Sequence, residues 1–202
     1  GATSQSCLIA GTTPGVIVDE YDECGGSITI TWTVASGCDN SSVQESITIP
    51  VTPAAEPTIT LPTLPASLTC DEAAAYTAPD ATYSNGMTGT CEISGTATGV
   101  KTEDFTICGG TITITYTVDP GDNCDRAAVV ETATIEVLPA PAPTITLPEV
   151  PSSLTCEEAA AFTAPSASYS NGATSESCLI DGTTPGVVAD EYDECGGSIT
   201  IT

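Results

Sequence analysis

One stretch decides the fold of this chain: Cys108-Gly109-Gly110-Thr111-Ile112-Thr113-Ile114-Thr115-Tyr116-Thr117-Val118. Its apolar and threonine side chains alternate strictly, so that they fall on opposite faces of an extended strand. A period of two with β-branched residues predicts a half-buried β-strand, and the glycine pair before it predicts a turn. The same pattern occurs at residues 24–34 and begins again at residues 195–202. We therefore expect an all-β protein built around a repeated strand.

The chain contains an internal repeat of 86 residues. Residues 57–62 (Pro-Thr-Ile-Thr-Leu-Pro) return as residues 143–148, and 143 − 57 = 86. Residues 1–31 also match residues 172–202 almost letter for letter, at a distance of 171, so two types of repeat alternate. We expect a segment of a longer tandem array, in which residues 1–56 are the C-terminal part of a repeat, 57–142 a complete repeat and 143–202 the N-terminal part of the next.

Short strands with frequent turn signals predict that each repeat is an immunoglobulin-like β-sandwich, with the repeats arranged end to end. In the complete repeat, strands are expected at residues 58–61, 67–70, 91–100, 103–107, 110–118 and 129–138. Residues 72–75 (Glu-Ala-Ala-Ala) could form one helical turn, but we expect extended structure because Pro79 follows soon after.

The composition excludes several classes of partner. Against 27 acidic residues stand only Lys101 and Arg126, and the net charge is −25. Such a chain repels phosphate backbones, so we expect no nucleic-acid partner. No apolar run approaches the ~18 residues of a membrane span. Ten cysteines at repeated spacings, in a chain without histidine, predict disulfides and therefore an oxidising, extracellular location.

The complete repeat holds four cysteines, Cys70, Cys91, Cys108 and Cys124, which allow three pairings. A Cys108–Cys124 bridge is disfavoured, because the intervening strand spans roughly 27 Å and the six residues after it reach back at most ~20 Å. We expect Cys91–Cys108 and Cys70–Cys124, one bridge at each end of the sandwich; the alternative is Cys70–Cys108 with Cys91–Cys124.

The spacing of 17 residues between the second and third cysteines recurs along the chain. On the favoured scheme it adds the bridges Cys7–Cys24 and Cys178–Cys195, while Cys38 and Cys156 pair beyond this segment.

Chemistry-bearing motifs are few. The acidic runs at residues 19–23 and 190–194 make Asp19, Asp22, Asp190 and Asp193 candidate calcium ligands, since hard cations prefer several carboxylate oxygens. No Asp-x-Asp-x-Asp-Gly loop is present, and we interpret both runs as solvated acidic loops. We expect no cofactor and no catalytic residues, because identical repeated units do not suit a single active site.

The order of these motifs resembles a known family. The complete repeat looks like the hyalin-repeat (HYR-like) immunoglobulin-type domains of giant bacterial surface proteins. The likeness rests on Leu68-Thr69-Cys70 after a Pro-rich strand, a second cysteine after a turn, a third before Thr-Ile-Thr-Tyr-Thr-Val and a final Asp122-Asn123-Cys124-Asp125. The likeness is closest to the tandem repeats of SprB-type gliding adhesins. The resemblance implies a cell-surface thread exported by the type IX route, which meets its surface or glycan ligands through other domains.

Two functions follow as hypotheses. In the first, the repeats are the non-catalytic stalk of a surface adhesin, and their partners are the neighbouring repeats of the same chain. In the second, the repeats are the body of an extracellular filament that assembles by burying its threonine-rich strand faces. A charge of −25 disfavours close lateral packing, which favours the stalk.

Overall fold

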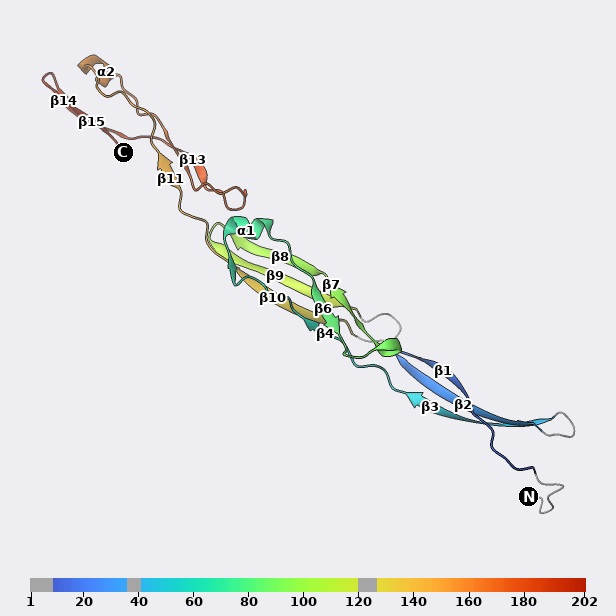
Figure 1. The fold of residues 1–202 in the computed structure, drawn as a ribbon. Coiled ribbons are helices and arrows are strands. Elements are labelled where there is room, and N and C mark those ends of the chain that lie inside the picture. The colour runs from blue at the N-terminus through green and yellow to red at the C-terminus, as the bar shows by residue number, and fades with distance from the viewer. Residues whose placement is uncertain (1–8, 36–40, 120–126) are drawn as a thin grey trace. The chain divides into compact units, whose positions relative to one another are not determined.

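The computed structural model describes residues 9–35, 41–119 and 127–202. Strands dominate these residues and form several small sheets (Figure 1), which confirms the all-β fold. The chain forms two compact units. Unit 1 contains residues 1–62, 80–98 and 116–131, and unit 2 contains residues 63–79, 99–115 and 132–202. The repeat boundaries at residues 57 and 143 stay a prediction from the sequence.

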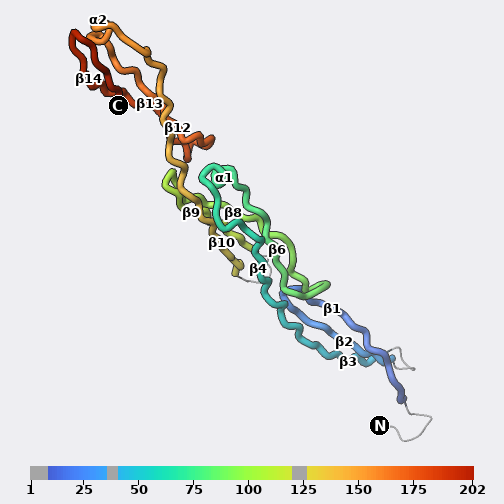
Figure 2. The backbone as a smooth tube through the Cα atoms, turned by 60° about the vertical axis from the view of Figure 1, so that its left-hand side comes forward, coloured from blue at the N-terminus to red at the C-terminus, as the bar shows by residue number. Residues whose placement is uncertain are grey.

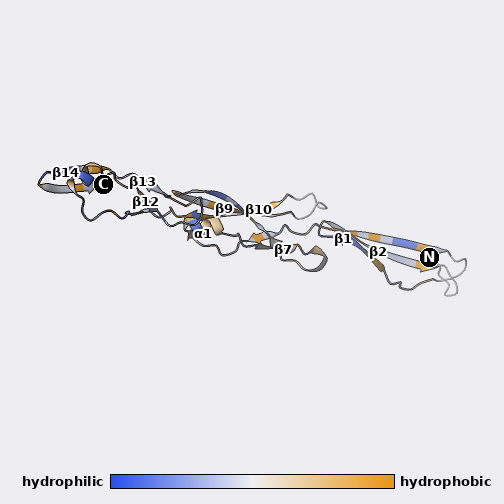
Figure 3. Ribbon diagram, turned by 90° about the horizontal axis from the view of Figure 1, so that it is seen from above, coloured by the Kyte–Doolittle hydropathy of each residue, from blue (hydrophilic) through white to orange (hydrophobic). Residues whose placement is uncertain are grey.

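The first sheet of unit 1 is an antiparallel meander. It contains β1 (Val16–Asp22), β2 (Gly25–Ala35) and β3 (Ser42–Val51) in the order β1-β2-β3. Hydrophobic and hydrophilic residues are interspersed along these strands (Figure 3). Ile28, Ile30 and Trp32 are only half-buried, while Ile47 on β3 remains 57% exposed. This sheet therefore carries apolar side chains that unit 1 leaves in contact with solvent.

The second sheet of unit 1 has the order β4-β6-β7 and consists of β4 (Thr58–Thr60), β6 (Ala81–Ser84) and β7 (Ser94–Ala97). A short 3-10 turn, η1 (Gly89–Cys91), lies between β6 and β7 in the sequence. Ala81 and Ala97 are opposite each other in the register and are both buried. The core of this sheet is thus formed by small residues rather than by aromatic side chains.

The organising stretch forms β9 (Gly109–Val118), as predicted. It lies inside a sheet of order β5-β10-β9-β8, with β5 (Ser67–Leu68), β8 (Gly99–Thr106) and β10 (Val129–Val137). Ile112, Ile114 and Tyr116 are 0% exposed, which confirms the alternation. Gly110, the second residue of the strand, has a φ of +152°, and a Cβ there would collide with the carbonyl oxygen of Asp104. The glycine is therefore required by the tight hairpin.

The repeat is reproduced in the structure of unit 2. β11 (Thr144–Thr146), β12 (Ala167–Ser170) and β13 (Asp181–Thr184) form a sheet of order β11-β12-β13. Its register pairs Thr144 with Ser170, 86 residues after the pairing of Thr58 with Ser84. A hairpin of β14 (Val188–Asp193) and β15 (Gly196–Ile201) follows. The repeated sequence thus specifies the same local pairing twice.

The predicted strands at residues 91–100 and 103–107 have the wrong bounds, because β7 ends at Ala97 and β8 runs without a break from Gly99 to Thr106. A second prediction of secondary structure is also wrong. Residues 72–75, expected to be extended, belong to the helix α1 (Cys70–Ala75), and the equivalent α2 (Cys156–Ala160) follows in the next repeat. The physical reason is a capping box, in which the side chains of Thr69 and Glu72 satisfy each other's backbone N–H groups. This cap stabilises one short helix despite the proline that follows.

Candidate functional site

The candidate site is a disulfide clamp in unit 2 between α1 and the turn that precedes β13. Cys70 and Cys178 are joined by a disulfide with a Cα–Cα distance of 5.7 Å and a sequence separation of 108. The tube in Figure 2 shows the chain after β12 approaching α1. Both cysteines are buried, at 2% and 0% exposure. Because the first belongs to the predicted complete repeat and the second to the next, the bridge joins consecutive repeats.

The α1 side of the clamp is fixed by its cap. The backbone N–H of Thr69 donates to Glu72 Oε2 at 2.8 Å, and the N–H of Glu72 donates to Thr69 Oγ1 at 3.4 Å. The backbone hydrogen bond from Thr69 lowers the pKa of Glu72, since it favours the carboxylate. The cap holds Cys70 at the first position of the helix, so its sulfur has a defined direction.

The turn side of the clamp is organised by Asn171. Its Nδ2 donates to the carbonyl oxygen of Cys178 at 2.8 Å, and its Oδ1 accepts the N–H groups of Ala173 at 3.2 Å and Ile180 at 3.0 Å. Gly172 follows with a φ of +71°, in the left-handed region that favours glycine. One amide side chain therefore shapes the loop that presents Cys178.

Asp71 provides a second contact across the clamp. Its Oδ1 accepts the N–H of Ser175 at 3.0 Å, and its Oδ2 accepts the N–H of Thr174 at 3.1 Å. These backbone hydrogen bonds, that of Ser175 first, lower the pKa of Asp71 below its ordinary value of 3.8. The carboxylate thus caps the turn of the next repeat beside the disulfide.

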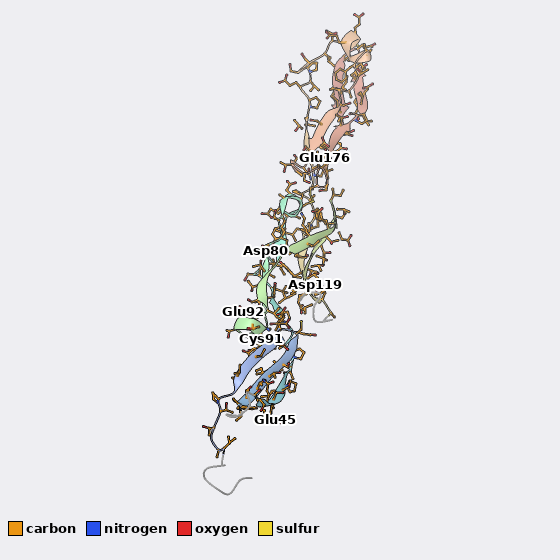
Figure 4. The ribbon with its side chains drawn as sticks, turned by 90° about the vertical axis from the view of Figure 1, so that its right-hand side faces the viewer. Glu45, Asp80, Cys91, Glu92, Asp119 and Glu176 are labelled. Carbon is orange, nitrogen blue, oxygen red and sulfur yellow. A yellow bond between two sulfur atoms is a disulfide. The ribbon has the colours of Figure 1, made fainter. Side chains whose placement is uncertain are left out.

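Both halves of the clamp occur a second time without a disulfide. Thr155 and Glu158 form the same capping box before and within α2, yet Cys156 is a free, exposed thiol. Asn85 makes the same hydrogen bonds as Asn171, donating to the carbonyl of Cys91 at 2.8 Å and accepting the N–H of Ile93 at 3.1 Å. Cys91, marked beside Glu92 in Figure 4, is also a free thiol. The local geometry of each half therefore does not depend on the bridge.

The predicted disulfide scheme needs correction. Cys70–Cys124 and Cys178–Cys195 are both wrong, because Cys70 and Cys178 are bonded to each other; the alternative Cys70–Cys108 is wrong for the same reason. The predicted Cys91–Cys108 bridge is also wrong, since both thiols are free. The prediction compared only pairings inside one repeat, whereas the observed bridge is shifted by one repeat.

The remaining cysteine predictions involve residues that the structure does not describe. Cys24 is in a disulfide, but its predicted partner Cys7 lies outside the described residues. Cys38 and Cys124 also lie outside them, so the pairing of Cys38 beyond this segment stays a prediction. Cys156 and Cys195 line one hollow next to α2, and both are free thiols.

The calcium candidates are not brought together. Asp19 and Asp22 are three residues apart on β1, as Asp190 and Asp193 are on β14, so that each pair points to opposite faces of its strand. Asp22 Oδ1 instead accepts the N–H of Cys24 at 2.8 Å, and Asp193 Oδ1 accepts that of Cys195 at 2.8 Å. No three His, Cys, Asp or Glu side chains converge anywhere in residues 9–35, 41–119 and 127–202. Asp22 and Asp193 thus serve the hairpin turns that follow β1 and β14.

No helix within the described ranges is long and apolar enough to cross a membrane. Comparison of the chain with family models, with curated proteins and with solved structures finds no match. The role of the site therefore has to be argued from its own geometry.

Proposed function

We propose that this chain is part of the stalk of a long extracellular adhesin, built from tandem immunoglobulin-like β-sandwich repeats and without catalytic activity. The observation that carries the proposal is the Cys70–Cys178 bridge, which closes a loop of 108 residues across the boundary between two repeats. A covalent link at that position has a mechanical consequence that a binding module or an enzyme does not need.

The consequence concerns tension along the chain. When the two ends are pulled, force passes from Cys70 directly to Cys178, so the residues between them bear no tension while the bridge is intact. The segment between them, with a sequence separation of 108, would otherwise contribute about 390 Å of extended chain, at ~3.6 Å per residue. The bridge thus limits how far a repeat lengthens if it unfolds, which is the property that a stalk under shear requires.

Location and charge agree with this role. A buried disulfide is typical of proteins in oxidising compartments, and an extracellular location is compatible with it. A net charge of −25 keeps neighbouring threads apart. The resemblance to surface adhesin repeats further implies that the chain lies at the cell surface and is exported by the type IX route. It also implies that surface or glycan ligands are contacted through other domains.

A second candidate function is the body of a multi-chain extracellular filament. The specific observation in its favour is the apolar surface of the β1-β2-β3 sheet, where Val16 is 65% and Val43 67% exposed. Strand faces of this kind are buried when chains associate laterally. The high negative charge opposes such packing unless cations screen it, so the stalk is the better supported function.

Immunogold electron microscopy of the native cells tests the proposal. Antibodies raised against this chain should label threads one chain wide at the cell surface, with label at regular intervals along each thread. Labelled fibres with several chains in cross-section would contradict the stalk function and support the filament function. Label confined to the cell interior would contradict both functions.

A further inference from the structure

We propose that Cys156 and Glu157 form an open docking site for the next repeat, in which Cys156 bonds to the second cysteine of a repeat of the 57–142 type. The partner is the turn that Asn85–Cys91 represents in this chain. The inference deepens the proposed stalk function and rests on it, because it assigns the same covalent clamp to every junction between repeats.

The helix half of the docking site is already formed in α2. The helix α2 has the same cap as α1, with the N–H of Thr155 donating to Glu158 Oε2 at 2.8 Å. Cys156 follows the capping residue as Cys70 does, and Glu157 takes the position of Asp71. An acidic residue therefore again stands next to the cysteine, where Asp71 accepts two backbone N–H groups from the docked turn.

The bonded cysteines and their free counterparts differ in burial. In α1, the clamped helix, Cys70 and Ala73 are buried, whereas α2 contains no buried residue. Cys178 is 0% exposed in its bridge, while Cys91 is only half-buried. Similarly capped cysteines thus differ in burial: the bonded pair is buried, whereas Cys156 is exposed and Cys91 is half-buried.

The length of each turn complements the length of the acidic side chain on which it docks. Seven positions separate Asn171 from Cys178 (178 − 171 = 7), and six separate Asn85 from Cys91 (91 − 85 = 6). The longer turn docks on Asp71, and the shorter turn would dock on Glu157, whose side chain is longer by one methylene group. If the two repeat types go on alternating with the 171-residue period, the repeat after residues 143–202 is of the 57–142 type and brings the shorter turn to the Glu-type helix. The alternation therefore matches each helix to one turn.

The chemistry is an ordinary thiol oxidation. The thiolate of Cys156 attacks a sulfur of a small disulfide oxidant such as oxidised glutathione, which releases one glutathione thiol and leaves a mixed disulfide. The thiolate of the second cysteine then displaces the other glutathione thiol. Two protein thiols become one disulfide, and one oxidised glutathione becomes two reduced molecules.

The test uses a longer chain made from this sequence, in which residues 1–202 are followed by residues 32–202. This junction keeps the 171-residue period, because residues 172–202 repeat residues 1–31. Val150→Ile in the original part and Met87→Leu in the added part label the two peptides by mass, at side chains that are 49% and 45% exposed. The chain is equilibrated in glutathione buffer, alkylated, digested without reduction and mapped by mass spectrometry.

We expect the labelled Cys156 peptide of the original part joined to the labelled Cys91 peptide of the added part. The Cys70–Cys178 bridge of the original part is the internal positive control. Cys156 joined to Cys195, which lines the same hollow, would overturn the proposal. So would a free Cys156 thiol in molecules that contain the Cys70–Cys178 bridge.

A matched pair of variants tests the acidic contact. Glu157→Ala should shift the new bridge toward its reduced thiols by about tenfold, the effect of losing one charge-assisted hydrogen bond. Glu149→Ala, at an exposed acidic residue outside α2, should leave the equilibrium unchanged. Equal effects of the two variants would overturn the role of Glu157. If threads are found at the cell surface but the Cys156 bridge does not form, the docking proposal fails and the stalk function remains. If the bridge forms but the chain is absent from the cell surface, the stalk function fails and the bridge remains.

Discussion

Replacing Cys178 by serine should destabilise the chain by the contribution of the whole Cys70–Cys178 bridge. The bridge closes a loop of 108 residues, and the chain-entropy relation gives about 5 kcal/mol for a loop of that length at 25 °C. Both cysteines are buried, at 2% and 0% exposure, so solvent does not hydrate the two thiols that a reduced bridge would leave. The expected loss of free energy of unfolding is therefore about 5 kcal/mol.

The assay is denaturant unfolding without reductant, performed on a cycle of variants. Cys70→Ser and Cys178→Ser should have equal effects, and the double variant should cost no more than either single one, because each substitution already removes the same bond. Cys195→Ser is the matched control, since that thiol is exposed and free.

Two results would refute this reasoning. Additive effects of Cys70→Ser and Cys178→Ser would mean that the two cysteines belong to different bridges. A loss for Cys195→Ser as large as that for Cys178→Ser would mean that these two are paired instead.

Three further predictions concern the clamp and the core. Asp71→Asn should remove part of the dependence of stability on acid pH. Because the pKa of Asp71 is lowered in the folded state, its carboxylate stabilises the fold above the ordinary pKa of 3.8, and this contribution is lost as the pH falls through the lower folded pKa. The stabilities of wild type and variant should therefore converge in acid titrations followed by circular dichroism, and a constant difference would contradict the assignment. Asn171→Ala should cost about 2 kcal/mol in denaturant unfolding, because the half-buried amide serves three backbone groups of the turn, and a loss near zero would argue against that role. Ile114→Ala should cost about 3 kcal/mol, since Ile114 is 0% exposed, whereas Thr115→Ala on the other face of β9 should cost far less; equal losses would contradict the alternation.

The strand pattern could be predicted from the sequence because it is local. Alternation in residues 111–118 determines which face is buried, and the glycines before it set the hairpin. The spacing of Thr69 and Glu72 is that of a capping box and also indicates the helix α1, and this cap outweighs the helix-breaking tendency of the nearby Pro79.

The disulfide could not be predicted by the same reasoning. Limits on strand length and chain reach constrain pairs within one repeat, whereas the partner of Cys70 depends on how the turn ending at Cys178 docks in the next repeat. The signal that could have been used is the acidic residue after each Leu-Thr-Cys, together with the Asn-Gly turn before each second cysteine. Asp71, the acidic residue after Cys70, accepts its backbone hydrogen bonds from Thr174 and Ser175 in the next repeat, so a comparison within one repeat does not find this contact.

The central claim is that a covalent bond joins consecutive repeats, and disulfide mapping of the native chain tests it most directly. The chain is alkylated, cleaved after glutamate without reduction and analysed by mass spectrometry. The account predicts that the peptide containing Cys70 is recovered joined to the peptide containing Cys178. Recovery of Cys70 joined to Cys124, or of Cys178 joined to Cys195, would contradict it.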